Sequence, residues 1–425
     1  MLDIKFIRDN TGLVSDAARK KRIAFDLNKL LEADDKRRAI LGDVEKMRAE
    51  QNTATDEIAQ AKDEKDRSAM IEKMRVFKEK LKTKEEELEW VMKEWRALML
   101  QVPNIPDVSV PDGESDADNK EVKVWGEKPK FSFKPESHIA LMENLGLVNL
   151  PRGVKVAGFR GYFLEGDGAL LSFALWQFAY KHFLEKGAFV PILAPSLVRK
   201  EAFLGTGYLP QGEDDLYKTQ DGEYLAGTSE VALMGYYMNE IIPKEDLPKK
   251  LLGFSPCFRR EAGSHGKDTK GIFRVHEFYK FEQVVLCEAN HQESVKEHEW
   301  MNRNTEEFIE ALGIPYRTVI NCGADLGLGQ VKKYDIELWV PSEEKYREIS
   351  SASYFHDFQT RRLNIRYRDS HGVLHFAHSL NSTAIATPRV LVALIENNQQ
   401  EDGSVIIPKV LEPYFGKSIL SKNSS

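Results

Sequence analysis

Arginines, carboxylates and an aromatic ring recur between residues 257 and 283, in a pattern suited to binding a charged ligand. Alternating residues flank a polar, glycine-containing segment at 263–271, which predicts a β-hairpin with a long loop. Because side chains two residues apart share a strand face, one face would carry Arg259, Glu261, Arg274, Phe278 and Glu282. Guanidinium groups bind phosphate in a fixed fork and a ring stacks on a base, so this face suits a base joined to a phosphate chain. A solvated, charged sheet face would give the same pattern.

The same stretch resembles motif 2 of the class II aminoacyl-tRNA synthetases, in its seryl-tRNA synthetase form. The resemblance rests on FRREAG at 258–263 and on GIFRVHEFYKFE at 271–282. It implies that Arg259 clamps the α-phosphate of ATP and the substrate carboxylate, that Arg274 holds the outer phosphates, and that Glu261 faces the adenine edge. The ATP-binding residues implied in this stretch are Arg259, Glu261, Arg274, Val275 and Phe278.

A second candidate ATP-binding segment consists of Glu348, Ile349, Ser350 and Ser351. A lone glutamate on an edge strand is commonly exposed, but Mg²⁺ prefers carboxylate and phosphate oxygens as ligands. The resemblance implies that Glu348 and Ser351 hold Mg²⁺ together with the ATP phosphates. Residues 352–356 depart from the commonest family sequence and leave these ligands intact.

A third candidate site would bind the amino acid. Thr228 lies where a helix is expected to begin, so capping alone would explain it. The resemblance implies that L-serine is bound by Thr228, Ser229, Glu230, Glu282, Asn381 and Thr383. Polar groups placed around a side-chain hydroxyl remain unpaired when alanine binds, so such a pocket would reject alanine.

Residues 378–389 form a run of small residues leading into a helix, with Arg389 near the helix start. Such an arginine is either an anion-binding residue or merely exposed. The segment resembles motif 3 of the class II synthetases, which implies that Arg389 stacks on adenine opposite Phe278. Three positions are bulkier than the usual glycines of the family: Ser382, Ala384 and Ala386.

Composition limits the other kinds of site. The length of 425 residues predicts two or three domains. The three cysteines show no CxxC spacing, which predicts neither zinc nor a disulfide framework. The net charge of −7 means that an RNA partner must be held by local basic patches. Without a bilayer-length apolar run or a signal-peptide core, we expect a cytoplasmic protein with no membrane partner.

Residues 30–100 contain no proline and one glycine. Apolar residues recur there by alternate threes and fours, as in a coiled coil, for example Val44, Met47, Ile58, Met74, Phe77, Leu81, Leu88, Val91 and Leu98. The polar segment 61–67 interrupts this seam, which favours two antiparallel helices of about 45 Å each over one helix of more than ~100 Å. A solvated helix pair or a dimerisation rod would fit the pattern, whereas the resemblance implies an arm that binds tRNA(Ser).

Pro103 ends the second helix, so we place a domain boundary near Ile105, between an N-terminal domain 1–105 and a catalytic domain 106–425. The expected fold class is α+β: an antiparallel-sheet class II synthetase domain with an N-terminal antiparallel coiled-coil arm. Residues 170–195 read as a helix running into a strand that ends on proline. They resemble motif 1 and thereby imply a homodimer, although a helix and strand buried within one monomer fit equally well.

Taken together, the resemblance implies ATP-dependent activation of L-serine to seryl-adenylate and its transfer to the 3′ end of tRNA(Ser), with tRNA(Sec) as a further acceptor. The implied catalytic residues are Arg259, Arg274, Glu348 and Arg389. No local Ser-His-Asp or Cys-His set occurs, so we expect no covalent enzyme intermediate, and positioning and charge neutralisation would supply the rate. Three alternatives remain: a paralogue that activates serine for another acceptor, a coiled-coil scaffold without catalysis, and another class II specificity.

Overall fold

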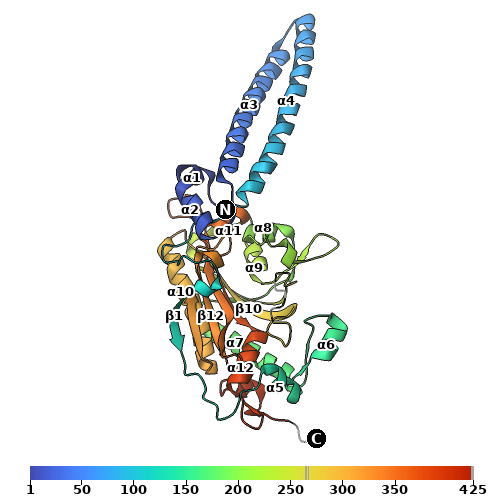
Figure 1. Cartoon of the computed structure of the whole chain (residues 1–425). Coiled ribbons are helices and arrows are strands. Elements are labelled where there is room, and N and C mark those ends of the chain that lie inside the picture. Colours follow the sequence, from blue (N-terminus) through green and yellow to red (C-terminus); the bar gives the residue numbers. More distant parts are fainter. Residues whose placement is uncertain (264–265, 267, 423–425) are drawn as a thin grey trace. The chain divides into compact units, whose positions relative to one another are not determined.

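The computed structural model describes residues 1–263, 266 and 268–422. These residues form two compact units. One is helical and comprises Asp3–Arg19 and Ile23–Pro103, and the other contains the remaining residues and is built on a large sheet (Figure 1). No helix in this described part of the chain is long and apolar enough to cross a membrane.

Two long antiparallel helices make up most of the helical unit. Its helices are α1 (Ile4–Asp9), α2 (Thr11–Lys20), α3 (Leu27–Gln60) and α4 (Glu64–Met99) (Figure 1). The side chains of Asp26 and Asp63 cap the two long helices by accepting first-turn N–H groups. Facing side chains of α3 and α4 form a small buried cluster of Ile40, Val44, Leu81 and Val91. The predicted helical hairpin is confirmed, and its seam is less deeply buried near the turn, where Ile58 and Met74 are half-buried.

An eight-stranded sheet forms the centre of the other unit. Its strands, in spatial order, are β1 (Lys120–Trp125), β11 (Tyr316–Ile320), β12 (Lys332–Val340), β13 (Lys345–Tyr354), β16 (His378–Ala386), β10 (Glu277–Cys287), β9 (Lys249–Phe258) and β4 (Val190–Leu193). Every neighbouring pair is antiparallel except β4 and β9. The predicted α+β class with an antiparallel sheet is therefore confirmed.

Among the helices that pack on this sheet are α7 (Asp167–Glu185), α10 (His291–Leu312) and α12 (Thr387–Asn397). Their buried apolar side chains form one cluster with Phe281 and Ile336 of the sheet. Burial of this kind contributes about 25 cal/mol per Å² of apolar surface and fixes the strands as a rigid floor. The side chains that alternate with these buried ones along the same strands point to the other face of the sheet, where functional groups can be held in place.

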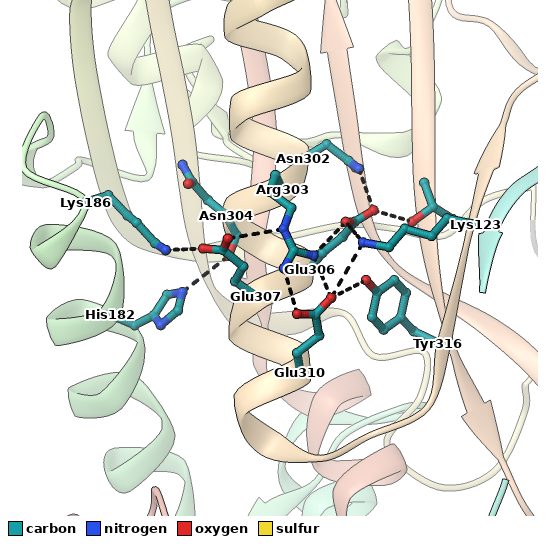
Figure 2. Close-up of polar contacts among 11 residues, drawn as sticks. Lys123, His182, Lys186, Asn302, Arg303, Asn304, Glu306, Glu307, Glu310 and Tyr316 are labelled. Atoms are coloured by element: carbon teal, nitrogen blue, oxygen red, sulfur yellow. Dashed lines mark hydrogen bonds and ion pairs between the residues drawn. The ribbon is translucent and has the colours of Figure 1, made fainter. Parts of the chain in front are cut away.

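Figure 2 shows a polar network that joins α7, α10 and the edge strand β1 through residues such as Arg303 and Glu310. Arg303 donates from Nη1 and Nη2 to the two oxygens of Glu310, at 2.5 and 2.7 Å. Buried Glu306 accepts a hydrogen bond of 2.7 Å from Thr318 and pairs with Lys123 of β1. The network thus ties the edge strand to α10 by charge-assisted hydrogen bonds.

Two β-bulges change the register next to the pocket described below. On β13, Ile336 and Glu337 oppose Ser350 and Glu348, so Ile349 is the extra residue. On β16, Phe281 and Glu282 oppose Ile385 and Thr383, so Ala384 is the extra residue. Bulges re-aim side chains. The second one places Thr383 opposite Glu282 in β10, where a regular register would place Ala384.

The predicted hairpin around the long loop needs one correction. The strand β9 ends at Phe258 and β10 begins at Glu277, so Arg274 and Val275 lie in the connecting loop and not on the return strand. Glu261 has a positive φ of 55°, which turns the chain away from the ladder directly after the first strand. The argument from strand parity is therefore wrong for Arg259, Glu261 and Arg274, whose placement comes from the loop.

Candidate active site

Ion pairs join the described residues of the segment between β9 and β10 to one another and to the sheet. Arg274 Nη1 donates to Glu261 Oε2 at 2.5 Å, and its Nε lies 3.4 Å from Asp268 Oδ2. Asp268 also accepts a 2.6 Å hydrogen bond from Arg347 of β13. Burial alone would raise the pKa of Asp268, but the hydrogen bond and charge of Arg347, together with Arg274, lower it. The loop is thus fastened to the sheet by alternating arginines and carboxylates.

A pocket lies between this loop, β10, β13 and the start of α12. Its lining includes most of the residues that the sequence assigned to ATP: Arg259, Glu261, Arg274, Val275, Phe278, Glu348, Ile349 and Arg389. The remaining lining residues are Phe273 of the loop, Lys280 of β10, Thr383 and Ala386 of β16, and Pro388 of α12. The pocket encloses only about 50 Å³, because Arg274 and Arg389 reach to Glu261 and Glu348. Phosphate oxygens would replace these carboxylates as partners of the arginines.

Glu348 is half-exposed at the bulge of β13 and pairs with Arg389, whose Nη1 lies 3.5 Å from its Oε2. The same Nη1 donates to the Glu348 carbonyl oxygen at 2.9 Å. Burial would raise the pKa of Glu348, but the charges of Arg389, Lys333 and Arg259 outweigh it and keep this pKa below its ordinary value. Glu348 therefore stays ionised at neutral pH and can serve as a ligand for a hard cation.

The two serines after Glu348 differ in their surroundings. Ser350 is buried and its Oγ donates to the carbonyl oxygen of Thr383 at 2.5 Å, so its hydroxyl is already engaged. Ser351 is half-buried, pairs with Asp335 in the ladder and does not line the pocket. Among the described residues no group of three or more His, Cys, Asp and Glu side chains is arranged to hold a metal ion.

Aromatic rings and guanidinium groups lie together in the pocket. The Arg259 guanidinium carbon is 5.5 Å from the Phe278 ring centroid. The Arg389 carbon is 5.0 Å from the ring of Phe273, over which Arg347 also lies at 3.9 Å. Phe273 was not selected from the sequence, although it lies in the same alternating run. Stacked cation–π arrangements leave flat surfaces on which a base can lie.

A buried polar cluster continues from this pocket along β10. Lys280 Nζ lies 2.6 Å from Glu282 Oε2 and donates to Thr228 Oγ1 at 2.7 Å. Thr383 Oγ1 donates to Glu282 Oε2 at 3.2 Å. All but Thr383, which is half-buried, are at most 4% exposed. The structure therefore brings together Thr228, Glu282 and Thr383, three of the residues assigned to the serine site, and adds Lys280.

Glu230 completes this cluster from the first turn of α9 (Glu230–Tyr236). Its Oε2 accepts from Tyr208 at 2.9 Å, and its Oε1 accepts from Gln359 Nε2 at 2.8 Å. Burial and repulsion from Glu282 raise the pKa of Glu230. Tyr208 and Gln359 come from two separate segments, and neither was assigned to the site from the sequence.

Two other residues assigned to the serine site are placed differently. The Ser229 hydroxyl is buried and has no hydrogen-bond partner within the described residues; it packs against Gly253, where a Cβ would lie 2.8 Å from its oxygen. Asn381 lies on β16 two residues before Thr383 and is half-buried, and it does not line the pocket. The Asn381 side chain lies on the same face of β16 as the side chain of Thr383.

Comparison with known proteins identifies the family. The model of the seryl-tRNA synthetase N-terminal domain matches residues 1–106, and that of the tRNA synthetase class II core domain (G, H, P, S and T) matches 216–398. The serine–tRNA ligase of Deinococcus radiodurans is 45% identical over 98% of both chains. The chain belongs to the seryl-tRNA synthetase family. It is thus an aminoacyl-tRNA synthetase, and its established relatives join serine to tRNA.

Solved structures of other seryl-tRNA synthetases have the same fold. The crystal structure of the Pyrococcus horikoshii enzyme complexed with ATP has a TM-score of 0.90 at 39% identity, covering 99% of this chain and 100% of that one. The cytoplasmic serine–tRNA ligase of Naegleria fowleri in complex with AMP has a TM-score of 0.86 at 33% identity, covering 100% of this chain and 99% of that one. The likeness extends over both the helical unit and the sheet.

Proposed function

We propose that this chain activates L-serine with ATP and transfers it to tRNA(Ser), using one continuous site on the sheet. One observation carries the proposal: Lys280 and Thr383 both line the arginine-rich pocket and both contact Glu282 of the buried cluster. A phosphate-binding pocket and a pocket for a small polar side chain thus share a wall. That arrangement suits a reaction between a nucleotide α-phosphate and a small amino acid.

In the first step the serine carboxylate oxygen attacks the α-phosphorus of ATP, a new P–O bond forms and pyrophosphate leaves with the electrons of the broken P–O bond. Arg259 neutralises the α-phosphate and the attacking carboxylate, and Arg274 holds the outer phosphates after exchanging its carboxylate partners for them. The adenine lies between Phe278 and Arg389, with Glu261 and Val275 at its edge. Fixed positive charge and orientation supply the rate, without a covalent enzyme intermediate.

Glu348 and Ser351 are the residues that would hold Mg²⁺ with the ATP phosphates. Glu348 fits the ion, because it is half-exposed and the charges of Arg389, Lys333 and Arg259 keep its pKa low against the opposing effect of burial. When bound there, Mg²⁺ neutralises phosphate charge. Ile349 and Ser350 contribute to the ATP site through the backbone and the bulge that aims Glu348.

Serine is selected by its hydroxyl. Both contacts of Glu282 fall on Oε2, and within the described residues Oε1 has no donor, so it can accept the hydrogen bond of the substrate hydroxyl. Thr228, Ser229 and Glu230 receive the ammonium and carboxylate, with Asn381 and Thr383 on the opposite strand. Alanine would leave Glu282 without this donor in a dry pocket, which costs about 1–3 kcal/mol.

In the second step a terminal ribose hydroxyl of the tRNA attacks the acyl carbon of seryl-adenylate, and AMP leaves. We assign tRNA(Ser), and tRNA(Sec) as a further acceptor, to the helical hairpin of α3 and α4, with residues 1–105 and 106–425 acting as tRNA-binding and catalytic domains. The match of the seryl-tRNA synthetase N-terminal model over residues 1–106 supports this division of labour. Charging of tRNA(Ser) also implies a cytoplasmic site of action.

A homodimer formed through the motif 1 region belongs to the same proposal. The strand β4 lies at one edge of the large sheet, and its side chains Val190 and Leu193 are 57% and 81% exposed. On α7, Leu170 and Phe173 are exposed as well. An exposed apolar edge strand is a template for pairing with a second chain. Sedimentation analysis tests it: a Leu193→Lys variant should shift from dimer to monomer.

Serine-dependent exchange of labelled pyrophosphate into ATP, followed by charging of tRNA(Ser), tests the proposed reaction. Exchange with serine and not with alanine or threonine supports it. Exchange that needs no amino acid, or prefers another, would overturn it.

A further inference from the structure

The amino-acid pocket contains a buried cation that the proposed reaction does not use. Lys280 is 4% exposed and its ammonium contacts two of the serine-binding residues, Glu282 Oε2 at 2.6 Å and Thr228 Oγ1 at 2.7 Å. Glu282 is itself 2% exposed. Two opposite charges in a dry environment interact strongly, because water screens neither of them.

The second buried carboxylate of the pocket is treated differently. Glu230 is 2% exposed and is held by the neutral donors Tyr208 and Gln359. Within the described part of the chain no lysine, arginine or histidine forms an ion pair with it. Of these three buried groups, Glu282 and Lys280 form an ion pair, whereas Glu230 has only neutral donors, so Glu230 is the carboxylate left for a substrate cation.

We propose that Lys280 is a specificity-determining residue that makes the side-chain end of the pocket electrically neutral. The inference rests on the proposed activation of serine. A single substrate cation, the α-ammonium, then has its place at Glu230. The end formed by Glu282 and Lys280 accepts a neutral hydroxyl and rejects an amino acid that carries a second ammonium there, because that charge would lie next to Lys280.

The isosteric competitor is L-2,3-diaminopropionate, in which an ammonium replaces the serine hydroxyl. Because each ammonium lowers the pKa of its neighbour, the comparison is made at mildly acidic pH, where both amines are protonated. In K280M, Glu282 loses its cation, so a substrate ammonium becomes its natural partner. In E282Q, Lys280 loses its carboxylate, so the same ammonium meets an unpaired positive charge. The two variants should therefore move the preference between the amino acids in opposite directions.

The experiment measures the affinities of both amino acids by equilibrium titration, with pyrophosphate exchange as a second readout. The ratio of diaminopropionate to serine affinity should rise about ten- to a hundredfold in K280M, and fall below the wild-type ratio in E282Q. K280R, which keeps the charge, should retain the wild-type order. A merely structural role would weaken both amino acids alike and leave the ratio unchanged.

Thermal unfolding of each variant shows whether it is folded at the assay temperature. If K280M is not folded, the result for E282Q decides. A ratio of diaminopropionate to serine affinity that does not fall in E282Q then contradicts the inference. Equal ratios in wild type, K280M and E282Q, or a shift in the same direction in both variants, would also overturn it. Failure of the wild type to activate serine would refute the proposed function instead, so the two failures are distinguishable.

Discussion

Tyr208→Phe should make serine activation more sensitive to acid. The Tyr208 hydroxyl is one of two donors to the Glu230 carboxylate, at 2.9 Å, and the other is Gln359. Burial and the charge of Glu282 raise the pKa of Glu230, and the donors oppose this by stabilising the ionised form. In the proposed site the substrate ammonium binds ionised Glu230, so serine binding should weaken as the pH falls through this pKa.

The size of the effect follows from the lost hydrogen bond. A hydrogen bond to a charged group contributes about 1.5–3 kcal/mol, and 1.36 kcal/mol corresponds to one pKa unit. Removing the hydroxyl raises the pKa of Glu230 further, so the acid limb of kcat/KM for serine should move about one to two pH units upward. The KM for serine should rise, and kcat at high pH should change little.

The assay is pyrophosphate exchange at a series of pH values, with serine varied at saturating ATP. Tyr236→Phe is the matched control, because Tyr236 is 62% exposed and does not line the pocket. An acid limb that stays in place in Tyr208→Phe, or moves to lower pH, would refute the assignment of Glu230 as the ammonium-binding carboxylate supported by Tyr208.

Three further variants test other parts of the site and the fold. Arg389→Ala should raise the KM for ATP about ten- to a hundredfold with little change for serine, because a charged contact to the nucleotide is lost; equal ATP kinetics would contradict the role of the arginine. Replacing residues 51–74 of the helical hairpin by a short turn should preserve pyrophosphate exchange and strongly reduce charging of tRNA(Ser); undiminished charging would contradict the role of the arm. In Glu310→Gln, the unfolding temperature should fall less steeply as the pH is lowered in the acid range. Hydrogen bonds from Arg303 and Tyr316 hold the pKa of Glu310 at about 2, so its contribution is full above about pH 4.3 and is lost as the pH falls toward 2; an equally steep fall in the variant would contradict this.

The sequence predicted those parts of the fold that depend on local periodicity. The apolar seam and the polar interruption at 61–67 were enough to predict α3 and α4 as a hairpin. Alternation predicted β9 and most of β10, but extended the return strand back to Phe273. The strand β10 begins only at Glu277; just before the mispredicted residues, Gly271 has a positive φ of 74° and a Cβ there would lie 2.4 Å from His138 Nε2.

The composition of the site was predictable only in part. Lys280 was within reach of the sequence, since it has the same strand parity as Phe278 and Glu282, but it was not assigned to the site. Tyr208 and Gln359 were not, because their contacts join segments more than a hundred residues apart or separated by a loop. The bulges at Ile349 and Ala384 depend on tertiary packing, which no local pattern encodes.

The central claim is that the arginine-rich pocket neutralises ATP while serine attacks it. The most direct measurement is serine-dependent pyrophosphate exchange by the purified chain with Mg²⁺, compared between Arg259→Ala and Arg260→Ala. Arg260 is the exposed neighbour of Arg259 and does not line the pocket, so it is a matched control. We predict exchange in the wild type and Arg260→Ala, and its loss in Arg259→Ala at an unchanged unfolding temperature. Full exchange in a folded Arg259→Ala variant, or none in the wild type, would contradict the account.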